Sequence, residues 1–211
     1  MKIQENISLK NYNTFGVEAK AHYFVEVHDL HELKYATEFA KINHIKILFL
    51  GGGSNLLFTQ DFDGLVIKLN LKGISEEILD ENHVLVSAKA GENWHEFVLY
   101  TLSKNYGGLE NLSLIPGNVG TCPIQNIGAY GTEIKDHFVS CKALNLETSE
   151  IEELSLEDCK FGYRDSIFKT SAKGKYVIVE VTFKLTTQNH LIKTEYGAIS
   201  TELKSSLSVS I

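Results

Sequence analysis

The fold of this chain is decided by a short apolar stretch that runs into three glycines, Lys46-Ile47-Leu48-Phe49-Leu50-Gly51-Gly52-Gly53-Ser54-Asn55. Residues 46–50 are typical of a short buried strand. The glycines then allow left-handed backbone angles and a close approach of the backbone to another group. Consecutive N–H groups in such a turn can form a concave nest for phosphate oxygens, and Ser54 and Asn55 add side-chain donors. The stretch lacks both the P-loop and the Gly-x-Gly-x-x-Gly patterns, so a tight turn with a purely structural role stays the alternative.

The elements around this stretch predict a small α/β unit that ends near residue 70. Residues 21–27 form an apolar and aromatic run that is typical of a strand. Asp29 is a suitable N-cap, and apolar residues recur at helical spacing from Leu30 to Ala40. A further strand is expected at 65–69. A strand, a helix, a strand and a glycine-rich turn in this order favour residues 1–70 as one α/β subdomain.

The chain beyond residue 70 is richer in strands, which predicts a second, α+β subdomain over residues 71–200. We expect strands at 83–88, 138–146 and 176–185, and a helix from Asn93 to Asn105. In the last of these strands five apolar residues alternate, and we expect them to share one face: Val177, Val179, Val181, Phe183 and Leu185.

Two shorter signals complete this outline. Residues 155–158 resemble a capping box for a short helix, after an acidic run at 147–157 that is typical of a solvated hairpin. Apolar residues at a spacing of four predict a final helix from Ala198, through Leu203 and Leu207, with no stop signal before Ile211. We therefore expect residues 201–211 to be the start of a truncated C-terminal region.

Composition excludes several classes of protein. The 211 residues carry a net charge of −7 and a pI of about 5.6, which argues against general nucleic-acid binding. No stretch is long and apolar enough to cross a membrane, and Cys122, Cys141 and Cys159 are expected to be free thiols in a reducing compartment, the cytoplasm. The eight histidines show no metal-ligand spacing, so no metal is expected. Nothing in the sequence indicates an oligomeric state.

A second candidate binding segment is the loop Ile115-Pro116-Gly117-Asn118-Val119-Gly120-Thr121-Cys122-Pro123-Ile124-Gln125-Asn126-Ile127-Gly128-Ala129-Tyr130-Gly131. It holds both prolines of the chain, four glycines and no charged residue. An exposed linker is normally charged, whereas this composition suits a rigid loop packed on an uncharged, planar ligand. A buried structural Ω-loop is the alternative.

A third candidate is Arg164, which lies in Phe161-Gly162-Tyr163-Arg164-Asp165-Ser166-Ile167-Phe168-Lys169 and is the single arginine of the chain. A lone guanidinium among many lysines suggests a task that lysine performs badly, such as two-pronged binding of a carboxylate or phosphate. A structural ion pair with Asp165 is equally consistent with the sequence. Tyr196, which precedes a glycine in a polar loop, is by itself more typical of a partly buried aromatic residue.

Four segments in this order together resemble the UDP-N-acetylenolpyruvoylglucosamine reductase family, also called UDP-N-acetylmuramate dehydrogenases. They are Asn11–Gly16, Gly51–Asn55, the central loop 115–131 and Gly162–Lys169. The resemblance covers residues 10–200 and implies an α+β, PCMH-type FAD-binding fold, with FAD between the small α/β subdomain and the larger α+β subdomain. It also implies FAD-dependent, NADPH-driven reduction of UDP-N-acetylglucosamine enolpyruvate to UDP-N-acetylmuramate in peptidoglycan precursor synthesis.

The resemblance further implies roles for individual residues. Arg164 would be catalytic, because a rigid guanidinium stabilises negative charge that builds on the substrate carboxylate. Tyr163, Arg164 and Tyr196 would contact the nucleotide-sugar substrate. The residues that would bind FAD are Gly51, Gly52, Gly53, Ser54, Asn55, Gly117, Gly120, Gln125, Asn126 and Ile127.

One departure from the family pattern is large. The family's proton-donor serine segment, Gly-Ser-Phe-Phe-Lys-Asn-Pro, and its C-terminal catalytic carboxylate do not occur in these residues. We therefore expect the chain to be a partial enzyme. Two alternatives are another flavin oxidoreductase of the same fold and a non-catalytic flavin-binding fragment. The first glycine-rich loop has no histidine for covalent flavin attachment, which counts against the flavin oxidases.

Overall fold

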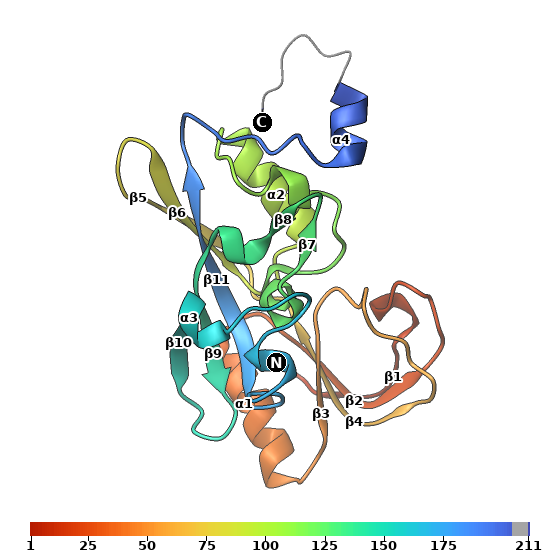
Figure 1. The fold of residues 1–211 in the computed structure, drawn as a ribbon. Helices are drawn as coiled ribbons and strands as arrows, with labels where there is room; N and C mark the ends of the chain where they lie inside the picture. The colour runs from red at the N-terminus through yellow and green to blue at the C-terminus, as the bar shows by residue number, and fades with distance from the viewer. Residues whose placement is uncertain (204–210) are drawn as a thin grey trace.

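The computed structural model describes residues 1–203 and 211, and its strands form two main sheets (Figure 1). The small sheet has the order β1-β2-β4-β3, and the large sheet has the order β10-β9-β11-β6-β5. The strands are β1 (Gln4–Ser8), β2 (Lys20–Val27), β3 (Ile47–Leu50), β4 (Phe62–Leu69), β5 (Ile74–Ile78), β6 (His83–Lys89), β7 (Gly128–Ala129), β8 (Thr132–Glu133), β9 (Phe138–Asn145), β10 (Ile151–Ser155) and β11 (Tyr176–Thr186). The α-helices are α1 (Leu30–Ile42), α2 (Trp94–Ser103), α3 (Leu156–Cys159) and α4 (Gly197–Glu202). The 3-10 helices are η1 (Lys10–Tyr12), η2 (Glu110–Leu112), η3 (Val119–Gln125), η4 (Ile134–Asp136) and η5 (Ile167–Lys169).

The small sheet places the glycine stretch at the carboxyl end of β3. Strands β2, β4 and β3 run parallel, and β1 is antiparallel to β2. Helix α1 begins at the predicted cap, where the Asp29 side chain accepts a hydrogen bond from the Glu32 backbone N–H. Its buried face, which includes Leu33 and Ala36, packs on Val25 and Ile67 of the sheet. In open α/β sheets, ligands bind in the crevice beyond the carboxyl ends of the strands.

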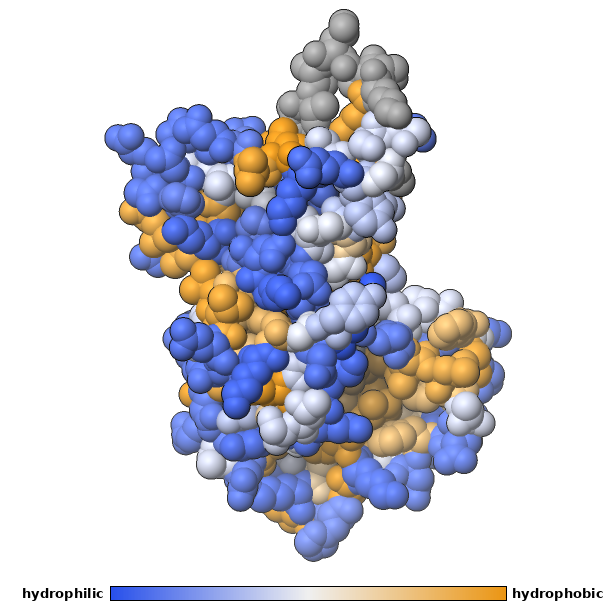
Figure 2. Space-filling view, viewed as in Figure 1, coloured by the Kyte–Doolittle hydropathy of each residue, from blue (hydrophilic) through white to orange (hydrophobic). Residues whose placement is uncertain are grey.

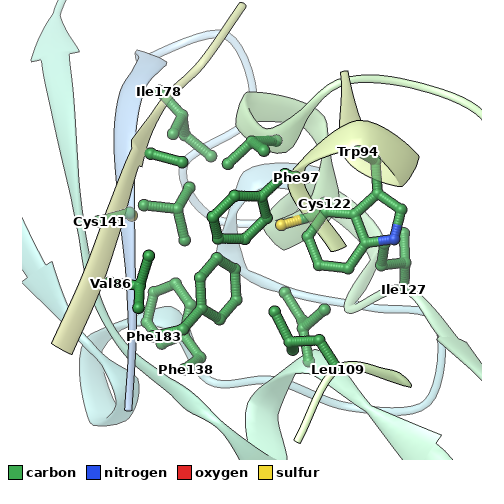
Figure 3. Packing of buried hydrophobic residues seen from close by; sticks show 14 of the residues in the cluster. Val86, Trp94, Phe97, Leu109, Cys122, Ile127, Phe138, Cys141, Ile178 and Phe183 are labelled. Atoms are coloured by element: carbon green, nitrogen blue, oxygen red, sulfur yellow. The ribbon is translucent and has the colours of Figure 1, made fainter. Parts of the chain in front are cut away.

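The large sheet is antiparallel throughout and carries the main hydrophobic core. Figure 3 shows Phe97 of α2 packed against Phe183 of β11, with the Cys122 sulfur pointing between Phe97 and Trp94. The ring centroids of Phe97 and Phe183 lie 5.6 Å apart, and those of Trp94 and Phe183 lie 5.9 Å apart. The Trp94 indole N–H donates to the Leu112 carbonyl at 2.8 Å, so its polar atom is satisfied inside the core.

Strand β11 contributes to two cores, and the expectation that its five alternating residues share one face is wrong. The pairing register shifts between Ile178 and Glu180, so Val179 is an extra residue opposite β9. Because side chains alternate with a period of two, such a bulge reverses the faces. Val177 and Val179 therefore join the core beneath α1, whereas Val181 and Phe183 join the core beneath α2.

The bulge also buries a carboxylate. Glu180 is held between two lysines, with its oxygens 2.5 Å from Lys89 Nζ and 2.8 Å from Lys142 Nζ. Burial alone would raise the pKa of Glu180, but the two ammonium partners hold it below its usual value of 4.5. The ion pairs connect β6, β9 and β11 where the strand alternation is broken.

Most other predicted elements are confirmed, with small changes at their ends. The strands at 21–27, 46–50, 65–69, 83–88, 138–146 and 176–185 appear as β2, β3, β4, β6, β9 and β11. The capping box at Ser155 and Asp158 starts α3, and the acidic run forms the β9–β10 hairpin. Strands β1 and β5 were not predicted. The final helix begins at Gly197, and its expected continuation through Leu207 lies outside the described residues.

The subdomain boundary near residue 70 stays a prediction. Strands of the small sheet come from residues 4–69 and strands of the large sheet from residues 74–186, which supports that position. The two parts nevertheless share a core, because Val25 and Leu69 pack in the same cluster as Leu144 and Val177. Across the described residues, no helix has both the length and the apolar character needed to cross a membrane.

Replacement of Phe183 by alanine tests the central core. Phe183 is fully buried among aromatic rings, so Phe183→Ala is expected to lower the free energy of unfolding by about 3–5 kcal/mol. Tyr35→Ala is the matched control, because Tyr35 is 57 % exposed on α1 and its loss should change stability by about 0.5 kcal/mol or less. Urea unfolding followed by far-UV circular dichroism measures both. Equal losses in the two variants would contradict this description of the core.

Candidate functional site

A cleft of about 670 Å³ opens between the carboxyl end of the small sheet and the central loop. Figure 2 shows hydrophobic residues gathered around a hollow beside the lobe of the small sheet. The cleft brings together the glycine stretch, part of the central loop and the single arginine. Its lining residues are Leu48, Phe49, Leu50, Gly51, Gly52, Gly53, Ser54, Asn55, Leu56, Trp94, Ile115, Pro116, Asn118, Thr121, Cys122, Ile124, Gln125, Ile127, Gly128, Ala129, Arg164 and Lys169.

The glycine loop Gly51–Asn55 is packed too closely on its neighbours to carry side chains at its glycines. Gly53 has φ +68°, and a Cβ there would lie 2.0 Å from the Tyr12 carbonyl oxygen. A Cβ on Gly52 would lie 2.9 Å from the Gly117 Cα. The backbones of three segments therefore meet at this point, and the glycines are required by the contacts as well as by the backbone angle.

The N-terminal motif is the support on one side of the glycine loop. The Thr14 N–H donates to the Gly53 carbonyl at 3.1 Å. The buried Asn13 amide donates to the Leu9 and Val17 carbonyls at 2.8 and 3.0 Å, and its oxygen accepts from the Val17 N–H. Asn13 thus satisfies its hydrogen-bonding groups locally and fixes the turn that contacts Gly53.

The backbone donors of the glycine loop have no acceptor within the described part of the chain. Over residues 1–203, the N–H groups from Gly51 to Asn55 donate to no intramolecular acceptor. Unpaired backbone N–H groups need water or a ligand as a partner. Consecutive free donors at the carboxyl end of a strand form the type of concavity that binds phosphate oxygens. The apolar walls beside them suit a flat ring.

The central loop divides into residues that line the cleft and residues that hold the loop in shape. Gln125 and Ile127 line the cleft. Gly120 packs on Ala90, where a Cβ would lie 2.4 Å from the Ala90 Cβ. Gly117 has φ +122° and provides the close contact with Gly52.

Asn126 is one of the residues that hold the central loop in shape. It is buried in the left-handed conformation, donates to the Gly162 carbonyl at 3.0 Å and accepts from the Lys135 N–H at 3.2 Å. Gly117, Gly120 and Asn126 are therefore near the cleft without lining it, and their expected contact with a cofactor stays a prediction. Their visible task is to shape the loop.

Arg164 lies on the rim of the cleft in a tight turn. Gly162 and Asp165 exchange two backbone hydrogen bonds across the turn, and Arg164 has φ +52°. Its guanidinium donates to the Gly128 carbonyl at 3.3 Å, and the Lys169 ammonium donates to the Arg164 carbonyl at 2.7 Å. Within the described part of the chain, Arg164 makes no ion pair with Asp165, so the alternative of a structural pair gains no support.

The two tyrosines expected at a substrate lie outside the cleft lining. Tyr163 is 88 % exposed beside Arg164. Tyr196 is 53 % exposed and packs edge-on against Tyr130, with ring centroids 5.7 Å apart. Asn111 donates to the carbonyls of Tyr130 and Lys193, which ties the segment before Tyr196 to the central loop. Their contact with a substrate stays a prediction.

Sequence reasoning missed the apolar walls and one cation of the cleft. Leu48, Leu56 and Trp94 line it, although Leu48 and Trp94 were expected only within a strand and a helix, and Leu56 was given no role. Lys169 was quoted within its motif without a role, and it both lines the cleft and holds the Arg164 carbonyl. The sequence signal for this role of Lys169 was its position five residues after Arg164, across a short turn.

The three cysteines are buried, and the described residues form no metal-ligand cluster. The thiols of Cys122, Cys141 and Cys159 are all free, as predicted, and the structure shows that they are buried. Burial raises the pKa of the Cys122 thiol well above its usual value, so this residue is a packing group. Residues 1–203 bring no three His, Cys, Asp or Glu side chains together as metal ligands.

Comparison with known proteins agrees with this geometry. Residues 21–155 match the FAD binding domain family. The chain is 57 % identical over 205 residues to UDP-N-acetylenolpyruvoylglucosamine reductase from Flavobacterium johnsoniae; the match covers 96 % of this chain and 60 % of that protein. The chain therefore spans about three fifths of the length of this curated relative.

Solved structures share the fold. The crystal structure of UDP-N-acetylenolpyruvylglucosamine reductase from Thermus caldophilus matches with a TM-score of 0.71 and 26 % identity, over 96 % of this chain and 68 % of that one. A solvent-stable cholesterol oxidase matches with a TM-score of 0.63 at 15 % identity, over 86 % of this chain and 37 % of that one. The expected α+β, PCMH-type fold is confirmed.

Replacement of Gly53 by alanine tests the close contact at the glycine loop. Gly174→Ala is the matched control, because Gly174 has a similar φ of +76° but a Cβ added there would have no atom within 4 Å. The control is expected to lose about 1–2 kcal/mol from the left-handed angle alone. Gly53→Ala is expected to lose about 1–3 kcal/mol more, because its Cβ would overlap the Tyr12 carbonyl. Thermal and urea unfolding measure the difference, and equal losses would show that the Tyr12 contact is unimportant.

Proposed function

We infer that this chain, which belongs to the family of FAD-binding domains, holds FAD in the cleft between its two sheets. The pyrophosphate would lie on the free N–H groups of Gly51–Asn55, with the Ser54 hydroxyl and the Asn55 amide as further donors. The single observation that carries this inference is the row of unpaired amides at the carboxyl end of β3, within a cleft of ligand size.

The other walls of the cleft suit the ring of the same cofactor. Ile115, Ile127 and Leu56 provide apolar surface, and Gln125 and Thr121 provide polar groups at its edge. A flat heterocycle needs this combination of apolar faces and a few placed hydrogen-bonding groups. Gly117, Gly120 and Asn126 would act on FAD through the shape of the loop, whether or not they also touch it.

We further propose that the protein carrying this chain reduces UDP-N-acetylglucosamine enolpyruvate to UDP-N-acetylmuramate, with NADPH as reductant. The support is the similarity to reductases of that name and the four ordered motifs. FAD, when bound, would carry hydride from NADPH to the substrate. The buried free thiols suit a reducing compartment, so we place this reaction in the cytoplasm.

Arg164 is the residue of this chain best placed to assist that reaction. Hydride addition to an enol ether conjugated with a carboxylate builds negative charge on the carboxylate, and a fixed guanidinium stabilises that charge. Arg164 lines the cleft, and its backbone is held by the Gly162–Asp165 turn and by Lys169. Its guanidinium makes one hydrogen bond within the described residues, to Gly128, which leaves further donors for a carboxylate. Tyr163 and Tyr196 would contact the substrate at the exposed side of the same rim.

The flavin assignment is tested by the visible spectrum of the purified chain after incubation with FAD and removal of free ligand. We expect a bound oxidised flavin at one per chain. Gly52→Ala is expected to weaken FAD binding at least about tenfold, or roughly 1.4 kcal/mol, because its Cβ would push Gly117 away from the loop. Gly197→Ala, which introduces a Cβ with no atom within 4 Å, should leave FAD binding unchanged. Absence of bound flavin in the unaltered chain would refute the assignment.

The role of Arg164 is tested in the protein that carries this chain. Arg164→Lys is expected to lower turnover about 100-fold or more, since a lysine lacks the planar pair of donors. FAD binding should stay within about threefold of the unaltered protein, because the proposed pyrophosphate site is formed by Gly51–Asn55. Turnover that is the same in the variant would remove Arg164 from the reaction.

A further inference from the structure

Lys68 is a partly buried lysine directly behind the glycine loop, and no motif singled it out. It lies near the carboxyl end of β4, opposite Leu50 of β3 and Glu26 of β2 in the parallel register. Its ammonium donates a hydrogen bond to the carbonyl oxygen of Gly51. A lysine in a strand that lies between two other strands is unusual, because a buried ammonium needs hydrogen-bond acceptors or an opposite charge to replace water.

The contact with Gly51 fixes the orientation of a peptide group that borders the cleft. In a trans peptide the C=O and the following N–H point in opposite directions. Because the Gly51 carbonyl points to Lys68, the Gly52 N–H points away from Lys68. A cation on the carbonyl also polarises the peptide and makes that N–H a stronger donor. Gly52 itself lines the cleft and is exposed.

The charge of Lys68 is not cancelled by a direct partner. Among residues 1–203 it forms no salt bridge, and the nearby Glu26 carboxylate instead accepts from the Asn70 side chain at 2.7 Å. Burial and the neighbouring Lys72 lower the pKa of Lys68 below its usual 10.5, while Glu26 acts against this shift. The ammonium therefore places a positive charge directly behind the loop.

We propose that Lys68 is a positioning residue for the pyrophosphate of a flavin dinucleotide, acting through the Gly51–Gly52 peptide. This inference rests on the proposed binding of FAD in the cleft. Lys68 would hold the Gly52 N–H toward the phosphates and add a partly buried positive charge behind them, which solvent screens less than a charge on the surface. The part of a flavin that it recognises is therefore the diphosphate and not the ring.

The role of Lys68 is tested with two ligands that share the flavin ring and the ribityl chain. FAD adds a pyrophosphate and an adenosine, and riboflavin has neither. Lys68→Met, which keeps most of the unbranched side chain and removes the ammonium, is expected to weaken FAD binding about 10–100-fold and to change riboflavin binding by less than about twofold. Lys68→Arg, which restores a cation, is expected to recover most of the FAD affinity. Fluorescence titration of the full chain with each ligand measures all three proteins.

Lys72→Met is the matched control. The Lys72 ammonium also binds a backbone carbonyl, that of Gly91, but the Glu92 carboxylate lies 3.4 Å away and offsets its charge. We expect Lys72→Met to change FAD binding by less than about threefold. A loss as large as that of Lys68→Met would mean that general positive charge, and not Lys68, is responsible.

Other outcomes separate this inference from the proposed function. Equal weakening of FAD and riboflavin by Lys68→Met would show a structural role and would overturn the inference. Unchanged FAD binding in that variant would overturn it as well, and the binding of FAD in the cleft would stand. An unaltered chain that binds neither ligand would refute the FAD assignment and the role of Lys68 together.

Discussion

The site depends on one constraint, the meeting of three backbones at the glycine loop. Gly53 lies against the Tyr12 carbonyl and Gly52 against Gly117, at distances that leave no room for a Cβ. This contact joins the N-terminal turn, the carboxyl end of β3 and the central loop, which are far apart in the sequence. The N–H groups of the same loop are left without an acceptor in residues 1–203. The close packing and the proposed ligand binding therefore both require residues without a side chain at these positions.

The charges around the loop follow from the same arrangement. Lys68 approaches from behind on β4, whereas Arg164 and Lys169 lie on the rim formed by the turn after Gly162. A chain with a net charge of −7 thus concentrates cations where an anionic ligand would lie. Each of these three cations is held in place because it also donates to a backbone carbonyl. A site preorganised in this way needs little rearrangement when a charged ligand enters.

Sequence alone predicted most of the main helices and strands and pointed to the four motifs, but not how each motif acts. Local sequence signals were enough to predict three features: the strand and glycine turn at 46–55, the cap at Asp29 and the capping box at Ser155. The face to which each β11 side chain points could not be predicted, because the bulge at Val179 depends on pairing with a distant strand, β9. Lys68 was missed for a similar reason, since strand register decides what it faces. The hydrogen bonds of the Asn126 side chain to Gly162 and Lys135 were not predicted either, because they join segments far apart in the sequence.

The position of the FAD pyrophosphate is tested by a crystal structure of the chain with FAD bound. We expect pyrophosphate oxygens about 2.7–3.2 Å from backbone nitrogens of the Gly51–Asn55 loop. We also expect the flavin ring against Ile127 and Gln125, with Arg164 at the open side of the ring. Phosphates held elsewhere, with the amides of the glycine loop bound only to water, would contradict the proposed site.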